Sequence, residues 1–312
     1  MQVLKGRVTR INLMSVSPDS RYVVAGGYGC DIWDLEIPKA KPRDLVAKES
    51  MTWVPQLRFT LDALFALRLM TWTRFGLTDD TAVDFTSLQL EQPQRGIVDT
   101  ANGLLKSVNP IDGRPGRSVH EIVTFKLGGE ELGQAVSVNP VAGCPWINGF
   151  DPRGNRYLGD YGSSRSSLPA SVLFDAATDA VVATFERHHK WVSPNRSLPA
   201  RPWCFTPDGR RVIAPTETYL FVYDCALGGL PTTACSLPTG AELRALAIHP
   251  DGRILATVEN EREVTFRDAE TLQVMRTYDF AMPKVTCVAF TPDGTRCVVG
   301  NSRGKVLLFD VE

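Results

Sequence analysis

Short apolar runs separated by Pro-Asp-Gly turns recur along the C-terminal third of the chain. In each copy one apolar run leads into the turn, a second follows it, and a third ends in an aspartate. Proline sets φ for the first corner of a turn, aspartate bonds nearby backbone, and glycine accepts a positive φ, so each motif reverses the chain tightly. The pattern predicts antiparallel strands packed between neighbouring sheets. The three most complete copies span residues 203–224, 246–268 and 288–310.

The copies have a regular period. The turn aspartates Asp208, Asp251 and Asp293 lie 43 and 42 residues apart, and a period in the forties with several short strands per unit is typical of a propeller blade. The same spacing reaches Ser17-Pro18-Asp19-Ser20, a degenerate copy at residues 59–62, and another at 150–154. The distance between these last two copies fits two units, so a further blade is predicted at 96–138, with residues 121–126 as its third strand.

The repeats predict an all-β fold, a seven-bladed β-propeller closed by the N-terminal strand, in one domain of residues 1–312. The last repeat ends after its third strand, and residues 2–5 can supply the fourth, which hides two sheet edges. Residues 50–140 carry the weakest pattern, since 82–90 fit a third or a fourth strand, and six or eight blades are the alternatives. The predicted blades are approximately 7–50, 51–95, 96–140, 141–190, 191–238, 239–282, and 283–312 with 1–6.

These repeats resemble the WD-repeat β-propeller family, in its form with abundant Ser/Thr-Pro-Asp-Gly turns. The resemblance covers nearly the whole chain and is strongest at residues 8–34 and 200–312. One repeat ends in a literal Trp-Asp, at Trp33-Asp34; others end in Phe-Asp, Tyr-Asp or Arg-Asp, and the Gly-His pair of typical repeats is absent. The resemblance implies a non-catalytic scaffold or adaptor that presents the loops of a rigid ring to other proteins.

Charge and cysteine content narrow the class of protein. Lysine and arginine number 34 against 35 acidic residues, a net charge of -1, which excludes a strongly basic nucleic-acid binder. The sequence has no apolar run long enough to cross a membrane and no secretory signal. Its seven cysteines are scattered without a C-x-x-C pair and are expected to be reduced core residues. We expect a cytoplasmic monomer that binds neither nucleic acid nor membranes and carries no cofactor.

No motif predicts catalysis. The chain lacks G-x-S-x-G, Walker A and H-E-x-x-H sequences. Gly27-Tyr28-Gly29 is interpreted as a turn between strands. His249 fills a turn position that Ser or Thr holds in other repeats. The aspartates that end the third strands are also expected to be structural. The alternative is a lactonase-like propeller hydrolase with its site in the central channel. The predicted inner strands are mainly apolar, with Asn12, Arg58 and Arg244 as exceptions, which favours binding over catalysis.

Two long insertions give the candidate binding site. The step from Arg153 to Asp208 spans 55 residues, 12 more than the period, and contains loops at 160–169 and 186–202. Because strand direction alternates within a blade, both loops are expected on the face opposite the Pro-Asp-Gly turns. Tryptophan and arginine often dominate interface energetics, and binding residues usually lie on loops. We therefore predict that these two loops form a docking site for an acidic protein surface. The alternative is a solvated loop whose tryptophan, Trp191, lies against the blade rim. The candidate docking residues are Arg165, His188, His189, Lys190, Trp191 and Arg196.

Overall fold

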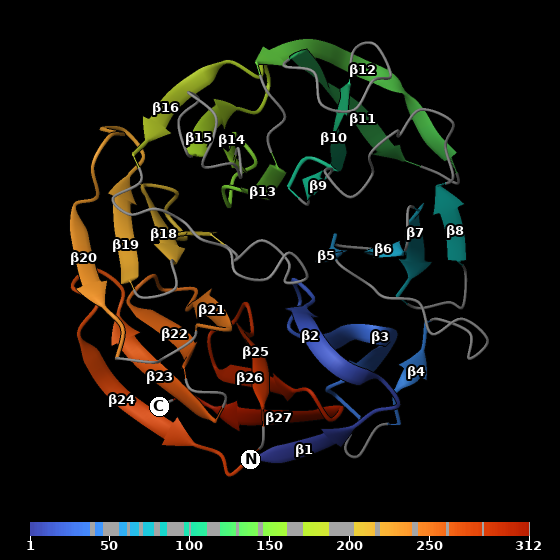
Figure 1. Ribbon diagram of the computed structural model, residues 1–312. Helices are drawn as coiled ribbons and strands as arrows, with labels where there is room; N and C mark the ends of the chain where they lie inside the picture. The colour runs from blue at the N-terminus through green and yellow to red at the C-terminus, as the bar shows by residue number, and fades with distance from the viewer. Residues whose placement is uncertain are drawn as a thin grey trace.

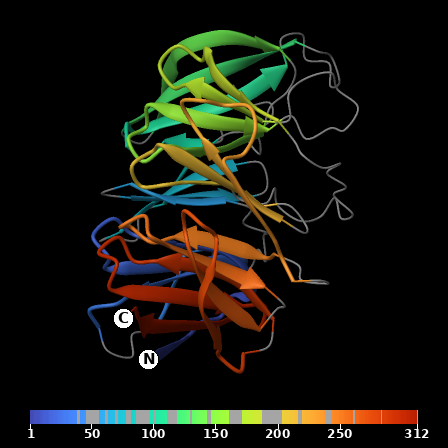
Figure 2. The same cartoon turned by 90° about the vertical axis from the view of Figure 1, so that its left-hand side faces the viewer.

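The computed structural model of this chain contains seven small antiparallel sheets, which are arranged in a ring (Figure 1). Figure 2 shows the same ring from the side. The prediction of a seven-bladed β-propeller is confirmed. The structure describes residues 1–37, 41–45, 56–60, 63–68, 71–77, 82–85, 97–99, 101–110, 119–128, 131–142, 146–160, 171–186, 203–215, 219–238, 243–259, 262–282 and 284–311.

The sheets, which we number as blades one to seven, follow one another around the ring in chain order (Figure 1). The first strand of a blade lies nearest the centre, as β5, β9 and β21 show. Blades one to three contain β2 (Thr9–Val16), β3 (Tyr22–Asp34) and β4 (Arg43–Asp44); β5 (Gln56–Phe59), β6 (Ala63–Arg68), β7 (Thr71–Gly76) and β8 (Ala82–Phe85); and β9 (Ile97–Asp99), β10 (Leu104–Pro110), β11 (Val119–Gly128) and β12 (Glu131–Ala142).

The other four blades repeat the same antiparallel order, and blade seven takes its outer strand from the start of the chain. Blades four to seven contain β13 (Trp146–Phe150), β14 (Arg156–Asp160), β15 (Ser171–Asp175) and β16 (Val181–Phe185); β17 (Cys204–Phe205), β18 (Arg211–Pro215), β19 (Tyr219–Asp224) and β20 (Thr233–Ser236); β21 (Ala245–Ile248), β22 (Ile254–Glu259), β23 (Glu263–Asp268) and β24 (Val274–Asp279); and β25 (Val285–Phe290), β26 (Arg296–Asn301) and β27 (Lys305–Asp310) with β1 (Gln2–Lys5).

A buried apolar cluster lies between each pair of neighbouring blades. Seven such clusters occur among the described residues, one for every junction of the ring. The middle strands of each blade are apolar on both faces because each blade packs against two neighbours. The cluster between blades seven and one includes Leu308, Val23 and Trp33. The first and last blades are therefore packed together as closely as consecutive ones.

Strand β3 of blade one turns back on itself. A straight strand of its 13 residues would span roughly 40 Å. Its ends are nevertheless adjacent, because the Leu35 N–H donates to the Arg21 carbonyl at 2.7 Å and Arg21 forms an ion pair with Asp34 at 2.7 Å. The reversal falls at Gly27-Tyr28-Gly29, where Gly29 has a φ of 99°. The predicted turn at this triplet is thus present, and β3 supplies two arms of blade one.

The N-terminal strand closes the ring as predicted. Strand β1 pairs with β27 in antiparallel register, with Gln2 opposite Leu308 and Lys5 opposite Lys305. Figure 1 shows the two chain ends beside each other at this blade. The side chain of Leu4 is buried in the cluster between blades seven and one, whereas Val3 is 47% exposed on the other face of β1.

A buried carboxylate holds the segment that leads from β1 to β2. Asp31 is 1% exposed, and its Oδ2 accepts hydrogen bonds from the backbone N–H groups of Arg7 and Val8 at 2.5 and 3.0 Å. Asp44 lies directly opposite Asp31 on β4. Burial raises the pKa of the Asp31 carboxyl; the two N–H groups act to lower it, and the Asp44 charge acts to raise it. The folded chain therefore favours the protonated form of Asp31 more than the unfolded chain does.

This shift predicts a pH-dependent effect of the Asp31→Asn substitution. A carboxyl group with a raised pKa in the folded state stabilises the fold at low pH, and that contribution is lost as the pH rises through the folded-state pKa. Asparagine does not titrate, so the variant should gain stability relative to the wild type between about pH 4 and pH 7. Urea unfolding across this range measures the difference, with Asp310→Asn, an exposed aspartate, as the charge control. A stability difference independent of pH would contradict the prediction.

Candidate interaction face

The predicted docking residues all fall in segments outside the described residues. The described residues form another candidate surface, on one face of the ring. The first strands of all blades run in the same direction, so the turns that follow them lie on one face, which we call the turn face. Its described turns span residues 17–21, 151–155, 206–210, 249–253 and 291–295. The candidate docking residues outside the described part are Arg165, His188, His189, Lys190, Trp191 and Arg196.

The turns share one backbone hydrogen bond: the first residue donates its N–H to the carbonyl five residues later, as from Thr206 to Arg211 at 2.9 Å. In blades one, five and seven the first residue is Ser or Thr, and its side-chain oxygen also accepts the N–H of that later residue, at 3.0 Å in blade five. The turn aspartate accepts from the same hydroxyl and from an N–H two residues on, as Asp208 does at 2.6 and 3.0 Å. In blade four Asp151 replaces the hydroxyl residue and accepts at 2.8 and 3.2 Å.

The aspartates at the ends of the third strands also belong to turns. Asp175 accepts the N–H groups of Ala177 and Thr178 at 3.1 and 2.9 Å, and Asp268 accepts those of Glu270 and Thr271 at 3.0 and 2.7 Å. For Asp268 the hydrogen bond from the Thr271 N–H is the main cause of a lowered pKa. The prediction that these carboxylates are structural is confirmed at this pair.

Side chains on the turn face bridge neighbouring blades. In each case a side-chain nitrogen of one blade donates to a backbone carbonyl of the next blade. The acceptor is always the fourth residue of that blade's turn. A ring nitrogen of His249 is one such donor, and because the Gly294 carbonyl can only accept, Nε2 carries the proton. The bridges are Asn102 Nδ2 to Gly154 at 3.1 Å, Arg156 Nη2 to Gly209 at 2.5 Å, His249 Nε2 to Gly294 at 2.9 Å and Arg296 Nη2 to Ser20 at 3.4 Å.

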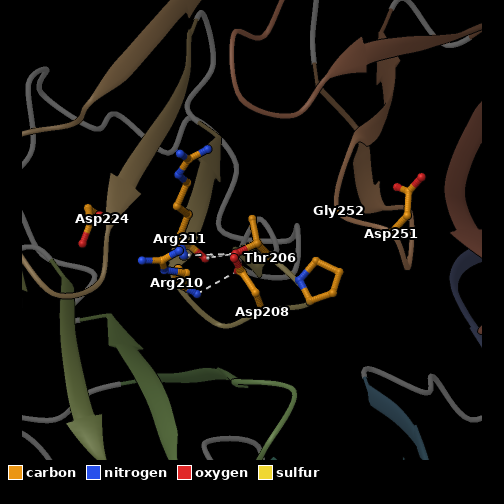
Figure 3. A pocket seen from close by; sticks show the side chains of 8 residues that line it. Thr206, Asp208, Arg210, Arg211, Asp224, Asp251 and Gly252 are labelled. Atoms are coloured by element: carbon orange, nitrogen blue, oxygen red, sulfur yellow. Dashed lines mark hydrogen bonds between the residues drawn. The ribbon is translucent and has the colours of Figure 1, made fainter.

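A hollow of about 320 Å³ opens on the turn face between blades five and six. Figure 3 shows Thr206 and Asp208 between Arg210 on one side and Asp251 on the other. The side chain of Arg211 forms an ion pair with Glu270 at 2.8 Å. The residues that line the hollow include Thr206, Asp208, Arg210 and Arg211 from blade five and Asp251 and Gly252 from blade six.

Two carboxylates of the hollow, those of Asp208 and Asp251, have lowered pKa values. Burial acts to raise the pKa of Asp208, but hydrogen bonds from Thr206 and the Arg210 N–H outweigh it, and the pKa lies below its ordinary value. The pKa of Asp251 is lowered in the same way, against burial, by the Arg253 N–H and by His249. At neutral pH the hollow therefore presents fixed negative charge on both of the blades that form it.

The polar residues predicted on the inner strands are Asn12, Arg58 and Arg244. Arg58 Nη1 donates to the Leu57 carbonyl at 2.7 Å, and burial lowers the pKa of the Arg58 guanidinium. The Asn12 amide is buried in β2, and Arg244 directly precedes β21. In the part of the chain that the structure describes, no three His, Cys, Asp or Glu side chains are grouped to hold a metal ion.

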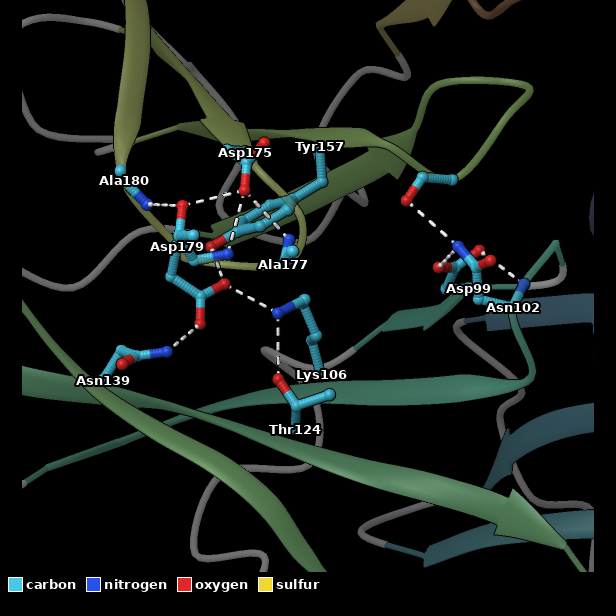
Figure 4. A network of polar contacts seen from close by, with 12 residues as sticks. Asp99, Asn102, Lys106, Thr124, Asn139, Tyr157, Asp175, Ala177, Asp179 and Ala180 are labelled. Atoms are coloured by element: carbon cyan, nitrogen blue, oxygen red, sulfur yellow. Dashed lines mark hydrogen bonds and ion pairs between the residues drawn. The ribbon is translucent and has the colours of Figure 1, made fainter.

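Two buried ion pairs were missed by the sequence analysis. Lys106 Nζ lies 2.6 Å from Asp179 Oδ1 at the junction of blades three and four, with both side chains 1% exposed (Figure 4). Within blade six, Arg267 bonds both oxygens of Glu259 at 2.8 and 3.1 Å, and both residues are buried. A lysine or arginine inside an otherwise apolar strand is the sequence signal for such pairs, since an unpaired buried charge is costly.

Four of the described cysteines lie in the core. Cys30, Cys225, Cys287 and Cys297 are buried, and burial raises the pKa of Cys287 to about 12. Such a thiol is not a nucleophile at neutral pH. The described residues include no helix with the length and apolar character needed to cross a membrane.

Two comparisons relate the chain to known proteins. The family model of the WD domain, G-beta repeat, matches residues 273–310, which contain β24 to β27. The matched unit therefore begins with the outer strand of blade six and ends with the third strand of blade seven. The chain is also 28% identical over 152 residues to Telomerase protein component 1 of Mus musculus. This alignment covers 47% of the chain and 6% of the mouse protein.

Proposed function

Because this chain is a WD-repeat β-propeller, we propose that it is a non-catalytic scaffold or adaptor that binds other proteins through the loops of a rigid ring. The proposal is supported by one observation: the described residues mainly build the framework of the ring. An apolar cluster fills every blade junction, and the turn aspartates accept hydrogen bonds from backbone N–H groups. Loops on such a rigid framework are where binding residues usually lie. The mouse relative is a protein component by name, which agrees with a role in assembly.

The proposed docking site lies in the two long insertions of blade four and of its connection to blade five. Trp191 supplies a large apolar anchor and Arg196 a guanidinium group, the two residue types that most often dominate interfaces. The surrounding side chains are basic, so the partner presents an acidic surface. We further propose that the protein acts as a monomer in the cytoplasm. The other docking residues of this site are Arg165, His188, His189 and Lys190.

Affinity capture tests the docking site. The chain and its Trp191→Ala/Arg196→Ala variant are used to capture proteins from native lysate, and Arg253→Ala serves as a control that removes an exposed positive charge from the turn face. We expect the double variant to lose at least 80% of its main partners, roughly the effect of removing 1 kcal/mol or more of binding energy. Melting temperatures should stay equal. Unchanged capture by the double variant would reject the docking site.

A further inference from the structure

Two of the bridges on the turn face are arginines at the same position of the repeat. Arg156 and Arg296 each lie five residues after the first residue of their turn. Each donates Nη2 to the turn carbonyl of the next blade, at 2.5 Å to Gly209 and at 3.4 Å to Ser20. Arg156 also keeps its Nε 3.2 Å from the Asp151 carboxylate of its own turn. The ring itself therefore illustrates how a guanidinium group fills a junction between blades.

Arg211 has the same repeat position at the junction of blades five and six, but its guanidinium group bonds elsewhere. Its Nη2 donates to Glu270 Oε1 at 2.8 Å, in the loop between β23 and β24. Within the described part of the chain, no side chain donates to the Gly252 carbonyl, the equivalent acceptor at this junction. The Pro207 ring lies beside this residue, since a Cβ at Gly252 would be 3.4 Å from Pro207 Cδ. The hollow thus lies where two other junctions hold a guanidinium group.

The charge of the hollow suits a cation. Three carboxylates line it, from Asp208, Asp224 and Asp251, against the guanidinium groups of Arg210 and Arg211. Arg211 is already paired with a fourth carboxylate, that of Glu270. The lowered pKa values of Asp208 and Asp251 keep these groups ionised at neutral pH. The hollow therefore has more carboxylate groups than guanidinium groups to pair with them.

We propose that this hollow binds the arginine side chain of a partner protein. The guanidinium group donates to the Gly252 carbonyl, as Arg156 and Arg296 do at their junctions, and forms charge-assisted hydrogen bonds with Asp208 and Asp251. Its planar array of five N–H donors can serve a carbonyl and two carboxylates together, whereas lysine offers one compact charge. The site lies on the turn face, so its test is independent of the docking loops proposed above.

N-acetyl-arginine-amide is the probe, with the amides of N-acetyl-citrulline and N-acetyl-lysine as matched controls. Binding is followed by two-dimensional NMR of the isotope-labelled protein through the backbone amides of Gly252 and Gly154. We expect the arginine probe to shift Gly252 saturably and to leave Gly154 unchanged, because Gly154 lies at the distant junction of blades three and four and its carbonyl already accepts from Asn102. Citrulline has the same shape without the charge and should bind at least tenfold more weakly, and lysine at least threefold more weakly.

Three exposed residues of the turn face provide the variants. Asp251→Asn should weaken arginine binding at least fivefold. Asp293→Asn, at the same turn position of blade seven, should leave the affinity unchanged, because Asp293 does not line the hollow and His249 already donates to the Gly294 carbonyl at the equivalent junction. Glu270→Gln provides the sharper test. It releases Arg211, which should turn to the Gly252 carbonyl and compete with the probe, so binding should weaken at least threefold although Glu270 does not contact the ligand.

Several outcomes would overturn the proposal. Equal affinity for arginine and citrulline would remove the role of charge, and equal effects of Asp251→Asn and Asp293→Asn would remove the role of this junction. Full affinity in Glu270→Gln would show that the position of Arg211 does not leave the hollow open. A Gly252 shift with inorganic phosphate and none with arginine would identify an anion site on Arg210 and Arg211 instead.

Discussion

Replacing Lys106 with methionine should lower the free energy of unfolding by about 3–5 kcal/mol, the range found when one member of a buried ion pair is removed. The Asp179 carboxylate also accepts hydrogen bonds from the Tyr157 hydroxyl and the Asn139 amide, each at 2.8 Å (Figure 4). Lys106 Nζ in turn donates to Thr124 Oγ1 at 2.8 Å. Methionine preserves the packing of the lysine stem but leaves a buried carboxylate without its cation. Urea unfolding monitored by circular dichroism measures the loss.

Two companion variants separate the charge from the hydrogen bonds. Adding Asp179→Asn to Lys106→Met removes the stranded charge and should restore a large part of the stability; asparagine also tolerates the positive φ of 56° at this position. Tyr157→Phe removes one hydrogen bond and no charge, so it should cost about 1 kcal/mol. If Lys106→Met destabilised the protein no more than Tyr157→Phe does, the ion pair would not be a main support of this junction.

The ring could be predicted from sequence because its signals are local. Each Pro-Asp-Gly turn is a short motif whose residues bond mainly to one another, so its spacing reports the blade period directly. The same spacing located the third strand of blade three at residues 121–126, which lie within β11, although no turn motif marks that blade. The closing role of residues 2–5 followed from counting strands, and β1 has these bounds.

The interactions between blades could not be predicted in this way. Lys106 and Asp179 are separated by 73 residues, and only the packing of blade three against blade four brings them together. The hollow depends on Arg211, which has the same repeat position as Arg156 and Arg296 but pairs with Glu270 of the next blade. A repeat pattern specifies what blades share, whereas these features are the differences between blades.

The second large effect is expected at Leu4, whose side chain is the main apolar contribution of β1 to the closed ring. Leu4 is 2% exposed and packs in the cluster that also contains Val306 and Leu308 of blade seven and Val23 of blade one. Truncating a buried leucine to alanine removes its packing and leaves a cavity, so Leu4→Ala should cost about 2–4 kcal/mol. Val3, its neighbour on the exposed face, is the matched control, and Val3→Ala should cost about 0.5 kcal/mol or less.

The location of the loss distinguishes closure from general packing. If β1 holds the ring shut, Leu4→Ala should speed backbone hydrogen exchange first in β27 and β2, which flank the closure, and least in β14 and β15 across the ring (Figure 1). Local opening at one junction costs less than global unfolding, so exchange there responds before the rest. An equal acceleration in all blades would instead mean that the ring unfolds only as a whole. In that case β1 contributes stability without acting as the point at which the propeller opens.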